Sequence, residues 1–212
     1  MSRRDSHTLT VSAEGIATLQ IANGTPLNIL DSRTIEGLTD ALREAASDRA
    51  IRMLVLRGSG DKAFVGGADI KEMATLEPAS ARAFITRLHD LCEAARDFPV
   101  PTVARLSGWC LGGGMELAAC CDIRVGTTAS HFAMPEVRIG IPSVIHARLL
   151  PRLIGEGRTR LLLLTGSAID GPTAERWGFL EKLVEPDALD DAIGQIAAEI
   201  LECGSAGIRL QK

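Results

Sequence analysis

LSGWCLGGGMELAACCD, residues 106–122, is the stretch around which the sequence is arranged. The apolar run 102–106 predicts a strand, and the residues after the three glycines predict a helix. Glycines at such a junction leave the backbone N–H groups at the helix start unhindered. The stretch therefore predicts a strand, a turn and a helix, with a turn suited to binding negative charge.

Glu116 is the chemically unusual residue of this stretch. It falls in the expected first helical turn, and residues 117–121 after it are all apolar. Its carboxylate is therefore predicted to point into a poorly solvated region. The simpler interpretation is that an acidic residue in a first turn only complements the helix dipole. A second motif is needed to decide between the two.

Length and composition narrow the class of protein. A chain of 212 residues with 46 % hydrophobic residues predicts one globular domain with a sizeable core. The net charge is −4, and no basic run is interleaved with aromatic residues, so nucleic-acid binding is disfavoured. No run approaches the roughly 18 to 20 apolar residues of a membrane span. We expect neither a nucleic acid nor a membrane as partner.

The cysteines and the first residues bear on the cellular compartment. None of the five cysteines forms a Cys-x-x-Cys pair or a Cys/His metal spacing, which predicts reduced core residues and no metal site. An arginine pair at positions 3 and 4 could suggest export, but the segment that follows alternates like a strand. The prediction is a cytoplasmic protein.

A second glycine turn resembles the first. Residues 63–73 read AFVGGADIKEM and follow a strand predicted over 51–57, with a helix start expected at Asp69. Ala68 and Gly113 are 113 − 68 = 45 residues apart, so the two turns suggest a repeat of strand, glycine turn and helix. Stacked repeats would let two N–H groups converge on one ligand atom, as in an oxyanion hole.

The other expected elements follow from hydrophobic periodicity and turn signals. Strands are predicted over 8–11 and 15–22, as a hairpin, and over 122–126 and 180–184, and residues 130–136 are predicted to be a strand that runs into a turn. Helices are predicted from Asp31 or Ser32 and over 78–97, 144–154, 158–165, 172–178, 187–203 and 205–212.

Common nucleotide and nucleophile motifs are absent from the sequence. Leu117 stands where a G-x-G-x-x-G fingerprint needs its last glycine, and neither a P-loop nor a G-x-S-x-G elbow occurs. The four histidines have no evident serine or cysteine partner and are expected to be structural or exposed; they are His7, His89, His131 and His146. Two N–H donors and two carboxylates would suit enolate formation from a thioester without a cofactor.

Three segments resemble the enoyl-CoA hydratase/isomerase (crotonase) family. Residues 63–73 and 108–122 resemble its two oxyanion-hole segments, and FAMPE at 132–136 resembles the segment that carries a second catalytic glutamate. The likeness runs in order from about residue 8 to 212. It implies an α/β fold built as a spiral of repeated ββα units, an acyl-CoA thioester substrate, no separate cofactor, and a homotrimer or a hexamer formed as a dimer of trimers.

The resemblance also assigns roles to residues at matching positions. The N–H groups of Ala68 and Gly113 would bind the thioester oxygen, Glu116 would act as base on water, and Glu136 would deliver a proton to C2. The residues expected to bind substrate are Leu27, Asn28, Ala68, Asp69, Ile70, Lys71, Leu111 and Gly112.

Because both glutamates are present, the chain resembles most closely a hydratase that converts trans-2-enoyl-CoA to 3-hydroxyacyl-CoA. Two alternatives stay open: an enoyl-CoA isomerase or acyl-CoA hydrolase of the same fold, and a non-catalytic acyl-CoA-binding or scaffold subunit. Product analysis separates the first from a hydratase, and binding without turnover would identify the second.

Two features depart from the family pattern. Residues 140–147 read GIPSVIHA where the family often has a glycine-rich G-x-x-P-G-x-G-G, which leaves the acyl-chain preference open. The family also has further C-terminal helices. We therefore expect residues 1–186 to form the core with the active site and 187–212 to be the truncated start of the helical region.

Overall fold

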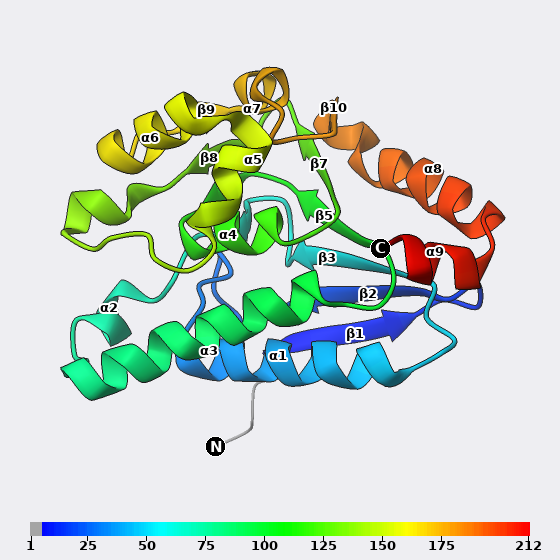
Figure 1. Ribbon diagram of the computed structural model, residues 1–212, viewed down its shortest axis with the longest axis horizontal. Coiled ribbons are helices and arrows are strands. Elements are labelled where there is room, and N and C mark those ends of the chain that lie inside the picture. The colour runs from blue at the N-terminus through cyan, green and yellow to red at the C-terminus, as the bar shows by residue number, and fades with distance from the viewer. Residues whose placement is uncertain (1–5) are drawn as a thin grey trace.

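The computed structural model describes residues 6–212, so the arginine pair at positions 3 and 4 lies outside the described residues. The strands form two sheets, of order β1-β2-β3-β5-β7-β10 and β4-β6-β8-β9 (Figure 1). The first sheet contains β1 (His7–Val11), β2 (Ile16–Ile21), β3 (Met53–Gly58), β5 (Thr102–Leu106), β7 (Ile123–Thr127) and β10 (Lys182–Val184). The second contains β4 (Ala63–Val65), β6 (Trp109–Leu111), β8 (His131–Ala133) and β9 (Ile169–Asp170).

From β3 to β8, successive strands alternate between the two sheets. β3, β5 and β7 belong to the larger sheet, while β4, β6 and β8, which follow them in the chain, belong to the smaller one. Each of these strands is parallel to its counterpart in the next repeat. The pair β3 and β4 is followed by helical residues 70–73 and 78–96, and the pair β5 and β6 by residues 113–119, which are also helical. This order confirms the predicted repeat of ββα units and the α/β class.

The helices are α1 (Ser32–Ser47), α2 (Ile70–Met73), α3 (Pro78–Arg96), α4 (Gly113–Ala119), α5 (Leu150–Ile154), α6 (Glu156–Thr165), α7 (Gly171–Trp177), α8 (Leu189–Glu202) and α9 (Ser205–Gln211). Three short 3₁₀ helices are η1 (Pro135–Ile139), η2 (Ala147–Leu149) and η3 (Pro186–Ala188). Asp31 caps α1 by accepting a hydrogen bond from the Thr34 N–H at 2.7 Å, and Pro78 occupies the first turn of α3.

The larger sheet is covered on both faces. In β3, Leu54 and Leu56 belong to the main core, while Met53 and Val55 join a second cluster with α8. Side chains alternate along a strand, so a strand that is apolar throughout packs on both sides. α1 and α3 lie beside each other at the bottom of the view in Figure 1, and α8 lies at the right, away from them.

Three details of secondary structure differ from the sequence prediction. The strand β6 lies between β5 and the glycine turn, and the two-residue strand β9 was not predicted. The helix predicted over 144–154 begins only at η2, and the N–H groups of His146 and Ala147 at its start are hydrogen-bonded to the carboxylate of Glu116. Within residues 6–212, no helix has the length and apolar character to cross a bilayer.

Candidate active site

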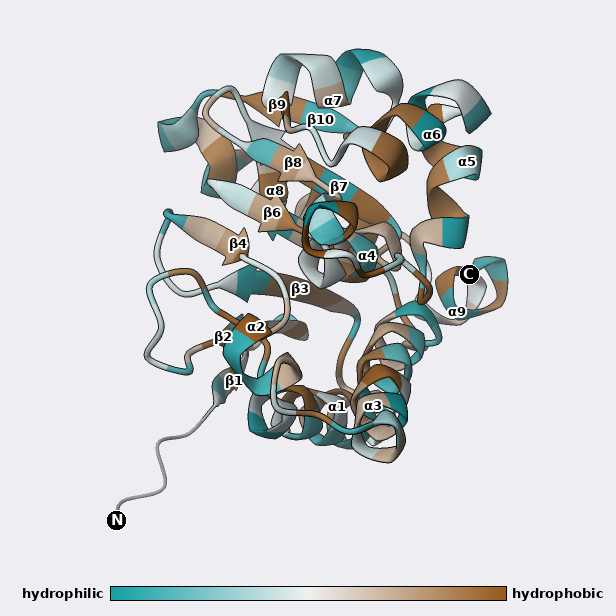
Figure 2. Cartoon of the chain, turned by 90° about the vertical axis from the view of Figure 1, so that its left-hand side faces the viewer, coloured by the Kyte–Doolittle hydropathy of each residue, from teal (hydrophilic) through white to brown (hydrophobic). Residues whose placement is uncertain are grey.

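The two glycine turns line one cavity. β4 and β6 pair in parallel, so the turns that follow them lie at the same edge of the smaller sheet. The cavity, of about 90 Å³, is lined by residues that include Ala68, Gly113, Glu116 and Glu136. α4 carries two of these four residues and lies in the middle of the molecule, next to β4 and β6 (Figure 2).

The N–H groups of Ala68 and Gly113 are both free to bind a ligand. Leu30 donates to the Gly67 carbonyl and accepts from the Asp69 N–H, each at 2.9 Å, so the Ala68 N–H points away from this bridge. Gly113 is the first residue of α4, where an N–H has no partner inside the helix. Neither N–H has an acceptor among residues 6–212, and both residues line the cavity.

Glu116 is 2 % exposed, as its apolar neighbours predicted. Its Oε1 accepts hydrogen bonds from the main-chain N–H groups of His146, at 2.9 Å, and Ala147, at 2.8 Å. Burial, with a smaller contribution from the nearby charge of Glu136, raises the pKa of Glu116 to about 7 against the lowering effect of these bonds. The carboxylate can therefore gain or lose a proton near neutral pH.

Glu136 reaches the same cavity from the first turn of η1. Its Oε2 accepts a hydrogen bond from the Ser143 hydroxyl at 3.1 Å. Burial raises the pKa of Glu136 as well, so both carboxylates bind a proton more readily than in water. Two such groups close together favour states in which they share one proton.

Close contacts account for the glycines of the turn. Gly112 has a φ of +51°, and a Cβ there would lie 2.4 Å from Oε1 of Glu136. A Cβ on Gly114 would lie 2.6 Å from Cβ of Val65, because α4 packs directly on β4. Larger residues would therefore displace the acidic group or the helix.

Some of the residues expected to bind substrate line the cavity, and others make hydrogen bonds that support the fold. Ala68, Ile70, Leu111 and Gly112 line the cavity. Asp69 caps α2 by accepting from the N–H groups of Lys71 and Glu72, and Lys71 is exposed on that helix. The Leu27 carbonyl accepts from the Gly66 N–H at 2.7 Å.

Asn28 is 0 % exposed and has a φ of +52°. Its amide donates to the carbonyls of Ala63, at 2.8 Å, and Phe64, at 3.2 Å. The side chain therefore fixes β4 to the segment between β2 and α1 and does not line the cavity.

Sequence reasoning missed two kinds of cavity residue. Ser143 and the amides of residues 146 and 147 orient the carboxylates, but no local motif marks them. The apolar wall was also missed, although the periodic face of α3 could have indicated it. This wall continues into a groove between α2, α3 and residues 139–141, and both share Ile70, Met73, Phe84, Ile85, Ile139 and Ile141.

Comparison with known proteins is consistent with this geometry. A family model described as "Enoyl-CoA hydratase/isomerase" matches residues 12–212. The chain belongs to the enoyl-CoA hydratase/isomerase family. The fold of this family member, with two sheets of alternating strands, confirms the crotonase-like architecture that its motifs implied.

Several relatives of this enoyl-CoA hydratase/isomerase family member carry specific names. The crotonyl-CoA hydratase of Syntrophomonas wolfei is 37 % identical over 94 % of this chain and 77 % of its own length. The short-chain-enoyl-CoA hydratase of Clostridium acetobutylicum is 32 % identical over 93 % of this chain and 76 % of its own. A crystal structure of enoyl-CoA hydratase from Mycobacterium smegmatis superposes with a TM-score of 0.94 at 28 % identity, covering 98 % of this chain and 81 % of that one.

Proposed function

We propose that the protein catalyses the reversible hydration of trans-2-enoyl-CoA to 3-hydroxyacyl-CoA. The observation that carries the proposal is the placement of a buried carboxylate, Glu116, and a half-buried one, Glu136, both with raised pKa values, in one cavity with two free N–H groups. An oxyanion hole and a carboxylate pair are what an enolate-forming addition needs. The two named hydratases among the relatives support the same reaction.

The proposed steps assign one task to each group. The thioester oxygen accepts hydrogen bonds from the N–H groups of Ala68 and Gly113, which stabilise the negative charge that develops there. Ionised Glu116 removes a proton from water as the water oxygen bonds to C3. Protonated Glu136 gives its proton to C2, so one molecule of water is added and the carboxylates exchange protonation states.

The apolar groove suggests where the acyl chain lies. Its walls contain Phe84, Ile85 and Ile141, and it begins at the cavity that holds the carboxylates. We propose that C4 and the carbons beyond it occupy this groove, and that Leu27, Asp69 and Lys71 lie along the path of the CoA part. Short acyl groups are the first substrates to test, as the names of the two relatives suggest.

We also propose that no separate cofactor is needed and that the protein assembles as a homotrimer or a hexamer in the cytoplasm. Sedimentation equilibrium measures the assembly, and assay of protein treated with a chelator and desalted tests the need for a cofactor.

The decisive experiment follows the conjugated-thioester absorbance of crotonyl-CoA after the protein is added. We expect the absorbance to fall and 3-hydroxybutyryl-CoA to form. Glu116→Gln and Glu136→Gln should each reduce kcat by about 10²- to 10⁴-fold, the usual contribution of a general acid or base. Glu44→Gln, at an exposed position of α1, is the matched control. Unchanged rates in both cavity variants would refute the mechanism.

A further inference from the structure

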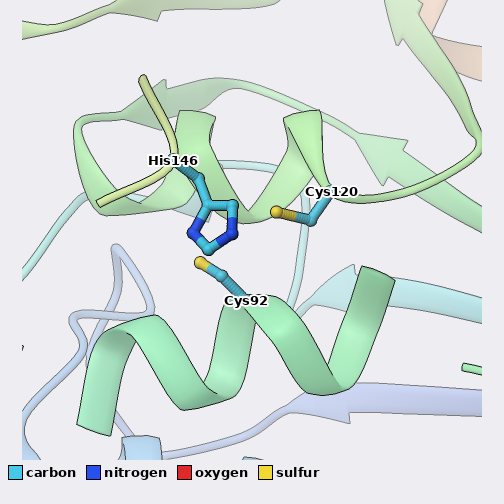
Figure 3. Close-up of side chains that lie close together, drawn as sticks. All are labelled: Cys92, Cys120 and His146. Atoms are coloured by element: carbon cyan, nitrogen blue, oxygen red, sulfur yellow. The ribbon is translucent and has the colours of Figure 1, made fainter. Parts of the chain in front are cut away.

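Three buried side chains from distant parts of the sequence lie close together near Glu116. Cys92 lies on α3, Cys120 ends α4, and His146 lies just before η2 (Figure 3). The two sulfur atoms and a ring nitrogen of His146 all lie within 4.8 Å of one another. The side chains come from separate elements, so no short Cys/His spacing marks this cluster in the sequence.

The hydrogen bonds of His146 leave one nitrogen unused. Nε2 is hydrogen-bonded to Oε1 of Glu93, and because a carboxylate only accepts, Nε2 carries the hydrogen. Nδ1 is buried and has no hydrogen-bond partner in the part of the chain that the structure describes. A buried polar atom without a partner is costly, and its presence calls for an explanation.

This arrangement is the one that histidine metal ligands adopt. A ligating imidazole uses one nitrogen for the metal and usually donates its other N–H to a carboxylate, which fixes the orientation of the ring. Glu93 already holds that position on His146. Figure 3 shows the His146 ring beside the sulfur atoms of Cys92 and Cys120.

We propose that Cys92, Cys120 and His146 form a binding site for one thiophilic metal ion, with Zn²⁺ as the best match. Two sulfurs and one imidazole nitrogen are typical zinc ligands, and three protein ligands suffice when water or an exogenous ligand takes the fourth position. Zn–S bonds of about 2.3 Å place tetrahedral sulfurs about 3.8 Å apart. The three ligand atoms therefore need to move together by no more than about 1 Å.

Metal binding at this site is balanced in charge. Each thiol loses its proton as its sulfur bonds to the metal, so two protons are released and the two thiolates neutralise Zn²⁺. Entry is possible beside Glu93, whose side chain is 31 % exposed, and past the irregular segment that carries His146.

A second donor set shares one member with this site. His89, Glu93 and His146 also have ligand atoms within 4.8 Å of one another, and His89 stacks on His146. That set uses Glu93 as a ligand, although its carboxylate is already hydrogen-bonded to Nε2 of His146, and it leaves the sulfur atoms of Cys92 and Cys120 unused. The sulfur set is therefore the better candidate.

The test uses the full chain, reduced and freed of metal with a chelator. After addition of ZnCl₂ and gel filtration, we expect one zinc per chain and a higher unfolding temperature, because a ligand that binds only the folded state stabilises it. With Co²⁺, we expect a thiolate-to-metal charge-transfer band. Cys92→Ser and Cys120→Ser should each weaken zinc binding by at least 100-fold and abolish the band.

Cys121→Ser is the matched control, because Cys121 is also buried beside α4 but its thiol faces the Leu117 carbonyl. It should bind zinc like the parent protein. Circular dichroism of the metal-free variants shows whether each is folded, and the unsubstituted protein alone tests stoichiometry and the cobalt band. The proposal is overturned if that protein retains no zinc, or if His89→Gln abolishes binding while both serine variants keep it.

Discussion

Oε1 of Glu136 occupies the space beside Gly112 that any larger residue would need. A Cβ added to Gly112 would lie 2.4 Å from this oxygen, well inside van der Waals contact. The glycine turn therefore does more than expose N–H groups, since it also leaves room for the second carboxylate.

Gly112→Ala should reduce hydration by at least 100-fold. The methyl group would push Glu136 out of position, and the φ of +51° would strain an alanine in addition. The measurement is kcat/KM with crotonyl-CoA. Gly60→Ala is the control, because Gly60 has a similar φ of +68° with no atom near its Cβ position. Equal losses of activity in the two variants would show that strain alone matters.

The pH profile should have an acid limb set by Glu116. Burial raises the pKa of this carboxyl to about 7, and a base must be ionised to accept a proton from water. We expect kcat/KM to fall about tenfold for each pH unit below 7. Steady-state rates between pH 5 and 8 measure this limb. A profile that stays flat down to pH 5 would contradict the role of Glu116 as base.

Glu116→Gln should stabilise the fold at high pH. The folded-state pKa of about 7 exceeds the ordinary value of 4.5, so this group's stabilising contribution is lost as the pH rises from 4.5 through 7. A glutamine keeps the oxygen that accepts from His146 and Ala147 but carries no charge. The gain in the free energy of unfolding at pH 8 should reach about 3 kcal/mol and should vanish near pH 4.5.

Urea unfolding at both pH values measures the effect. Glu44→Gln, at an exposed site, should show no comparable dependence on pH. A Glu116→Gln variant that is less stable at pH 8 would mean that the carboxylate supports the fold.

Ser143→Ala should raise the pKa of Glu136, the proposed proton donor, and leave Glu136 in the cavity. Its hydroxyl donates to Oε2 of Glu136, and this bond lowers the pKa of Glu136 against the effect of burial. Loss of the bond should move the alkaline limb of kcat/KM to higher pH and reduce kcat severalfold, with KM little changed. An alkaline limb that stays at its original pH would contradict the role of Glu136 as the proton donor.

Asp190→Ala should destabilise the attachment of α8 to β5. Arg105 is buried and donates from Nε to Oδ1 of Asp190 at 2.5 Å and from Nη2 to Oδ2 at 3.0 Å, while Asp61 holds Nη1 at 2.9 Å. The Asp190 side chain is 65 % exposed, so we expect a loss of about 1 to 2 kcal/mol. Urea unfolding measures it, with the exposed Asp191→Ala as control. Equal stability of the two variants would show that the ion pair contributes nothing.

Features encoded by local signals could be predicted from the sequence. Asp31 as helix cap, Pro78 at a helix start and the hairpin at the N-terminus each depend on residues close in the chain. The glycine turns were found for the same reason, and the isolated position of Glu116 among apolar residues correctly indicated burial.

Features that depend on contacts between distant segments could not be predicted. The bonds from His146 and Ala147 to Glu116 join residues 30 and 31 positions apart. The carboxylate binds N–H groups at the start of η2, so the helical pattern predicted over 144–154 begins at residue 147. β6 has only three residues and depends on pairing with β4 and β8.

Main-chain amides, rather than side chains, hold the carboxylate of Glu116. Any amino acid except proline supplies such a donor, so the identity of the side chains at positions 146 and 147 is free to change without removing these bonds. The bulky GIPSVIHA segment can therefore replace a glycine-rich one while its amides remain in place. Substitutions at positions 141–145 can therefore reshape the cavity wall while the main-chain amides of residues 146 and 147 continue to hold Glu116.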